Sequence, residues 1–180
     1  EKVQPYPCDP MSVYQQTMRS GSGAIYNHEG TIHDAKTKKF IRMVPEGKNY
    51  RALPAEYAGI YKYHEALTRY HSKKPSPTIN TGHRSHFHYK WDRIPTVRES
   101  ARLQSFADNF VFFGNKTQQY RQVGNAVPPL LGKAIATEIF KWLKKKEQPV
   151  SLIATICLIA VVGFALYTFS YKTAFNQNIM

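Results

Sequence analysis

The chain has 180 residues, of which 42% are hydrophobic and 21% are charged, so it can bury a core. Lysine and arginine outnumber aspartate and glutamate by 25 to 12, which gives a formal net charge of +13 at pH 7. This excess favours a polyanionic partner, with nucleic acid ahead of an anionic membrane surface, although a basic surface without a function is the alternative. The two cysteines, Cys8 and Cys157, lie far apart and indicate no disulfide framework. The chain begins with Glu1 and shows no signal peptide, which suggests an internal fragment of a longer product.

Residues 1–75 are polar and rich in turn signals, such as "SGSG" at 20–23 and "PEGKN" at 45–49. We interpret this part as short irregular elements with one helix over 54–71. Apolar and aromatic residues recur there at helical spacings: Leu53, Tyr57, Ile60, Tyr61, His64 and Leu67.

The stretch "RIPTVRESARLQSFADNF" at 93–110 predicts a capped helix. Thr96 is the expected N-cap, and Glu99 three residues later completes a capping box. The residues expected to face a core are Val97, Ala101, Leu103 and Gln104.

The stretch "YRQVGNAVPPLLGKAIATEIFKWLKKK" at 120–146 predicts a turn that leads into a helix. Gly124 permits a close approach of a ligand, and Pro128 and Pro129 suit a first helical turn. A broad apolar stripe follows: Leu130, Leu131, Ala134, Ile135, Ile139, Phe140 and Leu143. The turn is either a tight entry into a buried helix or the lining of a small-molecule pocket, where Asn125 offers a donor and an acceptor.

The run "SLIATICLIAVVGFALYTF" at 151–169 carries no charge. As a helix it would reach about 28 Å, close to the thickness of a bilayer's hydrocarbon core. Lys141, Lys144, Lys145 and Lys146 lie just before it and only Lys172 follows, so the N-terminal side would be cytoplasmic. A buried core helix and an out-of-frame tail are the alternatives to a membrane span.

Two of these stretches, in this order, resemble motifs IX and X of the cytosine-5 DNA methyltransferases. They are "TVRESARLQSF" at 96–106 and "YRQVGNAVPP" at 120–129. The preceding "PSPTINTGHRSHFHY" at 75–89 resembles the end of that family's target recognition domain. The resemblance covers residues 40–143 well and 1–39 loosely. One departure is Ala107, where the family usually has proline before the aspartate, and this should loosen a turn.

The resemblance implies S-adenosyl-L-methionine as the cofactor, with its pocket closed by Asn125, Ala126 and Val127. Motif IX is mainly structural in the family. Arg98 and Glu99 are therefore expected to make internal polar contacts.

The resemblance also implies double-stranded DNA as a partner. Arg84, with His83, matches the place from which a recognition loop enters the major groove, where arginine reads guanine through two hydrogen bonds. Weaker candidates for contacts with bases or phosphates are Thr78, Asn80, Thr81 and Lys90.

A metal site at His83, His86 and His88 is conceivable because the three are close in sequence. Apart from Asp92, no carboxylate or cysteine stands nearby with ligand spacing. We therefore interpret these histidines as exposed or facing DNA, and predict no metal.

The family's reaction needs residues that this sequence lacks. A cysteine thiolate attacks carbon 6 of a cytosine flipped out of the duplex. That cysteine belongs to a Pro-Cys-Gln segment, supported by Glu-Asn-Val and Gln-x-Arg-x-Arg segments, and none of the three occurs here. Cys8 follows a proline but precedes Asp9, so we do not expect it to be the nucleophile. We predict no catalytic residue in this chain.

We therefore expect an α/β fold, the C-terminal part of an S-adenosylmethionine-dependent methyltransferase. It would comprise a target recognition region (1–95), a motif IX and X segment of the catalytic domain (96–146) and an added hydrophobic helix (149–171). Without its other half, the helix over 120–146 should expose its apolar face.

The expected function is that of a DNA (cytosine-5-)-methyltransferase of a restriction-modification system, inactive until a catalytic N-terminal half or subunit is supplied. The alternatives are a non-enzymatic, membrane-tethered DNA-binding module and a decayed gene remnant. The expected location is the cytoplasm, with a single span at 151–169 as a possible tether to the inner face of the cell membrane.

Overall fold

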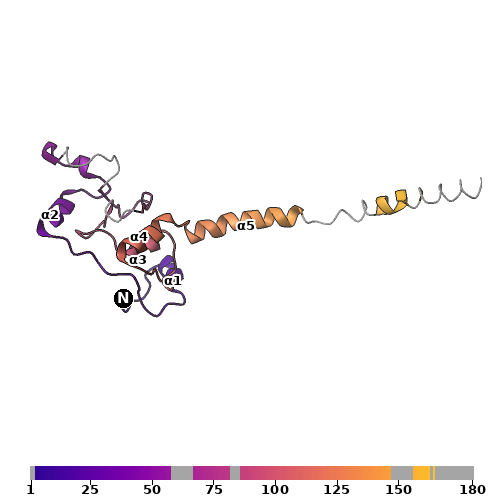
Figure 1. Ribbon diagram of the computed structural model, residues 1–180, viewed down its shortest axis with the longest axis horizontal. Coiled ribbons are helices and arrows are strands. Elements are labelled where there is room, and N and C mark those ends of the chain that lie inside the picture. Colours follow the sequence, from indigo (N-terminus) through magenta and orange to yellow (C-terminus); the bar gives the residue numbers. More distant parts are fainter. Residues whose placement is uncertain (1–2, 58–66, 82–85, 147–155, 163, 165–180) are drawn as a thin grey trace, which may run out of the picture. The chain divides into compact units, whose positions relative to one another are not determined.

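The computed structural model describes residues 3–57, 67–81, 86–146, 156–162 and 164 (Figure 1). The chain divides into two units, Glu1–Gly132 and Lys133–Met180. The helices and strands are α1 (Val13–Arg19), α2 (Ala35–Met43), η1 (Tyr50–Ala52), η2 (Ala55–Tyr57), β1 (Thr68–Arg69), β2 (His86–Phe87), α3 (Val97–Leu103), α4 (Lys116–Asn125) and α5 (Pro129–Lys146).

The first four α-helices begin at side chains that cap their free backbone N–H groups. Ser12 accepts a hydrogen bond from Gln15 N at the start of α1, and Asp34 accepts one from Thr37 N at the start of α2. Thr96 and Asn115 form capping boxes at α3 and α4. The capping box predicted for α3 is therefore confirmed.

The strands β1 and β2 pair in parallel, with Thr68 opposite His86 and Arg69 opposite Phe87. The helix predicted over 54–71 is wrong at its C-terminal end, because Leu67 has a φ of 57° and β1 follows it. The buried Arg69 side chain explains the difference: its guanidinium donates to the carbonyl oxygens of Val44, at 2.8 Å, and Ile41. Residues 58–66 lie outside the described part of the chain.

Two clusters of apolar side chains form the core. The first core cluster comprises Ile41, Val44, Tyr50, Leu67, Phe87 and Ile94. The second core cluster comprises Val97, Ala101, Phe106, Phe112, Tyr120 and Val123, with Ile79 and Ala126 packed against it. Val97, Ala101 and Gln104 are buried as predicted, whereas Leu103 is 48% exposed, so its predicted core position is wrong.

Residues 3–28 pack with the segment that follows α3. Gln4 and Ile25 form an isolated antiparallel bridge. Asp108 N donates to Met18 O at 2.7 Å, and Tyr14 OH donates to Arg102 O. The boundary at 95/96 stays a prediction, but these contacts join the start of the chain to the later segment.

The region predicted as one turn and one helix over 120–146 contains two helices. Gly124 and Asn125 belong to α4, so the connection is shorter than predicted, and α5 begins at Pro129 as expected from the proline pair. Gly132 N donates to Pro128 O at 2.9 Å, which closes the first turn of α5.

Within the described ranges, no helix combines the length and the apolar character needed to cross a membrane. Most of the predicted hydrophobic helix at 149–171 lies outside the described residues, which include 156–162 and 164 of it.

Candidate functional site

The turn predicted to close the cofactor pocket, residues 125–127 (called the cofactor turn from here on), lies at the C-terminal end of α4. Ala126 ends the helix with an extended backbone (φ −80°, ψ 146°), and its N–H donates to Val123 O at 3.3 Å. The buried side chain of Gln104 also donates to Val123 O, at 2.6 Å. On the other side of the turn, Ser105 Oγ accepts from Leu130 N at 3.0 Å. Gln104 and Ser105, both from the stretch 96–106, therefore hold the turn from its two sides.

The predicted cofactor residues are accessible. Asn125 and Val127 are exposed, and Ala126 is half-buried. Among the described residues, no hydrogen bond engages the Asn125 carboxamide, which leaves a donor and an acceptor for a ligand. Val127 adds an apolar surface that is 65% exposed.

Residues 78–81, part of the predicted target recognition region and called the recognition segment from here on, present three predicted DNA-binding side chains to solvent. Thr78, Asn80 and Thr81 are exposed, while Ile79 between them packs against the second core cluster. The backbone of Asn80 and Thr81 lies against α4 at Gly124, so the structure brings this segment next to the cofactor turn.

The other predicted DNA-binding residues are placed differently. Lys90 is exposed in the loop after β2, with its Nζ 5.1 Å from the centre of the Trp91 ring. Its backbone N–H donates to His88 Nδ1 at 3.0 Å, as does that of Trp91 at 3.1 Å. His83 and Arg84 lie outside the described residues.

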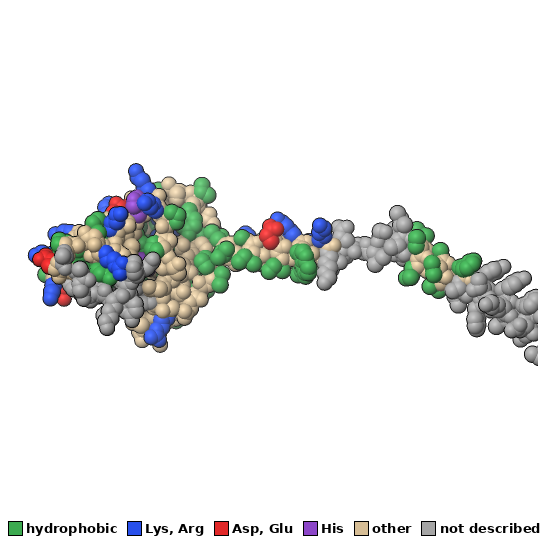
Figure 2. All heavy atoms as spheres, turned by 90° about the horizontal axis from the view of Figure 1, so that it is seen from above, with side chains coloured by type: hydrophobic (Ala, Val, Ile, Leu, Met, Phe, Trp, Pro, Cys, Tyr) green, Lys and Arg blue, Asp and Glu red, His purple; other side chains and the backbone are tan. Residues whose placement is uncertain are grey.

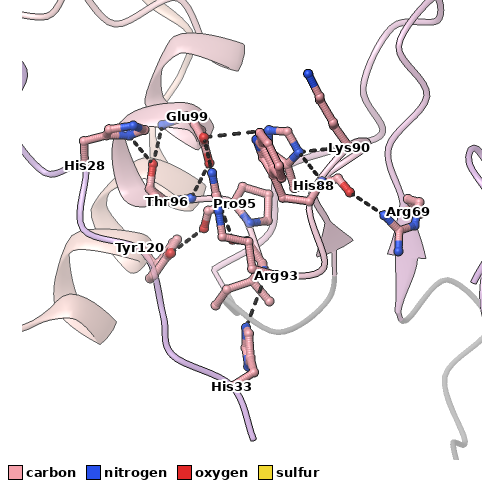
Figure 3. A network of polar contacts seen from close by, with 12 residues as sticks. His28, His33, Arg69, His88, Lys90, Arg93, Pro95, Thr96, Glu99 and Tyr120 are labelled. Atoms are coloured by element: carbon pink, nitrogen blue, oxygen red, sulfur yellow. Dashed lines mark hydrogen bonds and ion pairs between the residues drawn. The ribbon is translucent and has the colours of Figure 1, made fainter. Parts of the chain in front are cut away.

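Glu99 is the centre of a polar network that joins this loop to α3 (Figure 3). It accepts two hydrogen bonds of 2.7 Å from the Arg93 guanidinium and one of 2.7 Å from Thr96 N. Burial acts to raise the pKa of Glu99, but the hydrogen bonds from Arg93 and Thr96 outweigh it and hold the pKa below its ordinary value. The internal contact expected for Glu99 is present.

The same network constrains two histidines. His88 Nε2 lies 3.7 Å from Glu99 Oε1, and His28 Nδ1 lies 2.9 Å from Thr96 Oγ1. Burial lowers the pKa of both rings, with Glu99 acting against it. Tyr120 OH donates to Pro95 O at 2.5 Å and so connects α4 to the start of α3 (Figure 3).

Arg98 is fully buried and makes the internal contacts expected for it. Its guanidinium donates to the carbonyl oxygens of Tyr26, Ala107 and Phe110 at 2.9, 3.1 and 2.6 Å. The Ala107 carbonyl also accepts from Phe110 N at 3.1 Å, so the turn expected to loosen there is held by two donors.

Sequence reasoning missed the residues that position these elements. They are Tyr6, Asn27 and Ser105, whose partners lie far away in sequence. The burial of Gln104 was predicted, but its hydrogen bond to Val123 O was not. Gln104 and Ser105 lie between the apolar Leu103 and Phe106 in the "LQSF" stretch. Polar residues in such a position could have indicated side chains that hydrogen-bond inside the protein. The part of the chain that the structure describes contains no cluster of three or more histidine, cysteine, aspartate or glutamate residues that could hold a metal.

The chain matches a known protein family over most of its length. The model of the "C-5 cytosine-specific DNA methylase" family matches residues 6–141. The chain is 44% identical over 117 residues to the type II methyltransferase M1.HphI of Haemophilus parahaemolyticus, covering 65% of this chain and 32% of that relative. It is 35% identical over 131 residues to the type II methyltransferase M.AquIB of Picosynechococcus sp., covering 66% of this chain and 90% of that relative.

A solved structure shares the fold. It is the crystal structure of a protein assigned as a DNA modification methyltransferase and encoded within an E. coli prophage. The likeness has a TM-score of 0.60 at 21% identity and covers 79% of this chain and 40% of that chain. The chain thus spans about a third of the length of M1.HphI and two fifths of this neighbour.

Proposed function

This chain belongs to the C-5 cytosine-specific DNA methylase family, and we propose that it is the DNA-recognition and cofactor-closing part of a DNA (cytosine-5-)-methyltransferase. Methyltransferases of this family use S-adenosyl-L-methionine as the methyl donor. The observation that carries the proposal is the packing of an exposed recognition segment beside an exposed cofactor turn on α4. The type II relatives support a restriction-modification system.

The cofactor turn fits one end of S-adenosylmethionine. The amino-acid part of that molecule carries an ammonium and a carboxylate, and the Asn125 carboxamide can accept from the first and donate to the second. Ala126 and Val127 offer apolar contacts beside it. When bound, the cofactor supplies an activated methyl group. The residues of this chain bind and orient it.

DNA would contact the recognition segment and the loops near it. The excess of 13 positive charges attracts the phosphates. Thr78 and Thr81 offer exposed hydroxyl groups that suit hydrogen bonds to base edges or phosphates, and Asn80 between them is a further predicted contact. We assign the major-groove contacts to Arg84 and His83 and a phosphate contact to Lys90.

The catalytic cysteine would come from polypeptide outside this chain. Cys8 is exposed, and among the described residues no hydrogen bond or ion pair engages its thiol, so no base is in place to activate it. The large apolar side chains of α5 are 44% to 60% exposed: Leu130, Leu131, Ile135, Ile139, Phe140, Trp142 and Leu143. Figure 2 shows hydrophobic side chains along this helix. This face suits a missing catalytic half, and the match to 90% of M.AquIB supports a separate subunit of this extent.

The test combines this chain with the part of M1.HphI that the alignment leaves uncovered. Transfer of radiolabelled methyl groups from S-adenosylmethionine to duplex DNA is measured for each polypeptide alone and for the mixture. We expect transfer only from the mixture.

A pair of variants of α4 makes this test specific. Asn125→Ala should raise the KM for S-adenosylmethionine, whereas Gln122→Ala should not. Gln122 is the matched control, because its exposed amide on the same helix donates to Phe113 O at 2.8 Å instead. Methyl transfer by this chain alone would overturn the proposal, and DNA binding without any gain from a partner would favour the non-enzymatic DNA-binding module.

A further inference from the structure

Gly124 lies where the recognition segment approaches α4 most closely. A methyl group at its Cα would lie 2.5 Å from the carbonyl oxygen of Asn80, 2.6 Å from its carbonyl carbon and 2.7 Å from Cα of Thr81. A real Cβ essentially never comes within 3.0 Å of such atoms, and backbone cannot rotate away as a side chain can. Any residue other than glycine here must displace the recognition segment or the helix.

The backbone conformation of Gly124 does not itself require glycine. The residue lies within α4, one position before the helix ends, and its φ is not left-handed. Alanine is a better helix former than glycine, so helix propensity alone would favour alanine at this position. The close approach of a second backbone is therefore what requires a residue without a side chain.

The two sides of this contact carry the two proposed binding functions. On one side are Asn80 and Thr81 of the recognition segment, anchored by Ile79 in the second core cluster. On the other side Asn125 of the cofactor turn directly follows Gly124, and Gln104 holds Val123 O at 2.6 Å. Because both sides are anchored, a displacement of one is transmitted to the other instead of being absorbed locally.

We propose that Gly124 is a positioning residue that couples target-DNA recognition to the cofactor pocket. Its missing side chain lets the recognition segment seat directly on the turn of α4 that precedes the cofactor residues. DNA held by residues 78–81 then favours the cofactor-binding geometry of residues 125–127, and bound cofactor favours DNA binding by the same factor. This inference rests on the proposed function of both segments.

The test compares Gly124→Ala with Gly132→Ala in the full chain. Gly132 is the matched control, because it also lies in a helix but has nothing within 4 Å of an added Cβ. Binding to a fluorescent DNA duplex is measured at low salt, together with the melting temperature. We expect Gly124→Ala to weaken DNA binding roughly tenfold or more, and Gly132→Ala to bind as the wild type does.

The reconstituted enzyme separates positioning from loss of structure. Gly124→Ala should raise the KM values for DNA and for S-adenosylmethionine together and reduce the factor by which one strengthens binding of the other. A merely destabilised protein would lose active molecules, which lowers kcat and leaves both KM values unchanged.

A measurement on the wild type covers the case in which Gly124→Ala does not fold. Amide hydrogen exchange at residues 122–126 should slow when duplex DNA binds, because the seated recognition segment holds that turn. Unchanged exchange there, or unchanged DNA binding by a folded Gly124→Ala, overturns the inference alone. A wild-type chain that binds no DNA overturns the proposed function and the inference with it.

Discussion

Asn27 holds Phe112 through both atoms of its carboxamide, across 85 positions of the chain. Its Nδ2 donates to Phe112 O at 2.8 Å, and its Oδ1 accepts from Phe112 N at 2.9 Å. Asn27 is buried and has a φ of 59°, and its own carbonyl accepts from Arg98 N at 2.9 Å. One side chain thus pairs with both backbone polar groups of Phe112, as a residue of a neighbouring strand would do in a sheet.

Two substitutions of Asn27 should separate the contribution of its side-chain hydrogen bonds to stability from the contribution of its left-handed backbone conformation. Asn27→Gly keeps the left-handed conformation but leaves two buried groups unpaired, so we expect a loss of about 2 to 4 kcal/mol in the free energy of unfolding. Asn27→Ala should lose about 1 kcal/mol more, because its Cβ disfavours that conformation. Urea denaturation of both variants checks the order, and equal stabilities would contradict the role given to the backbone.

Asp108 should be costly to replace, because its carboxylate is fully buried among charged and polar partners. It accepts from Arg102 Nε at 2.9 Å, Arg102 Nη2 at 2.5 Å and Tyr6 OH at 2.7 Å. We expect Asp108→Asn to cost about 3 to 5 kcal/mol, since it leaves arginine charges without their carboxylate. Urea denaturation gives this value.

The control for Asp108 is Glu138→Gln, which removes an exposed carboxylate paired with Lys141 at 2.7 Å. Its melting temperature should match that of the wild type, because exposed pairs contribute little. An equal loss from both variants would contradict the distinction between the buried and the exposed pair.

Acid should destabilise the loop that carries Lys90. His88 Nδ1 accepts two backbone N–H groups, which requires a neutral ring, and burial lowers the pKa of His88 below its ordinary value of 6.5. The unfolded chain therefore binds more protons than the folded chain at pH values between the folded pKa of His88 and 6.5. The free energy of unfolding falls as the pH decreases through this range. His28, whose pKa is also lowered, acts in the same direction.

Melting temperatures measured from pH 7.5 to 5.5 test this expectation. His88→Asn keeps an acceptor near the two N–H groups but does not titrate in this range, so its melting temperature should depend less on pH. An unchanged slope in this variant would exclude His88 as a source of the effect.

The exposed face of α5 should make the chain self-associate. Ile139→Glu places a charge on this face. Thr137→Glu places the same charge two residues earlier in the chain, on the opposite side of the helix. We expect Ile139→Glu to reduce self-association in sedimentation and to abolish co-purification with a catalytic half. Thr137→Glu should change neither, and similar behaviour of the two variants would argue against a specific docking face.

Local chemistry explains what the sequence could predict. The Thr96–Glu99 capping box, the start of α5 at Pro129 and the internal role of Arg98 depend on residues close in sequence or on a family motif. The turn at Leu67 and the bond from Asn27 to Phe112 could not be predicted, because their partners are distant in sequence. In the candidate site, the accessible Asn125 was predictable, whereas the contact between Gly124 and Asn80 depends on tertiary packing.

The bond from Tyr6 to Asp108 joins residues 102 positions apart. Proteins rich in such distant contacts fold slowly, because a long loop must close before the contact forms. During translation, roughly 5 to 20 s pass between the synthesis of Tyr6 and that of Asp108. During that interval the apolar side chains of the early part of this chain are uncovered, so we expect it to depend on chaperones while translation continues.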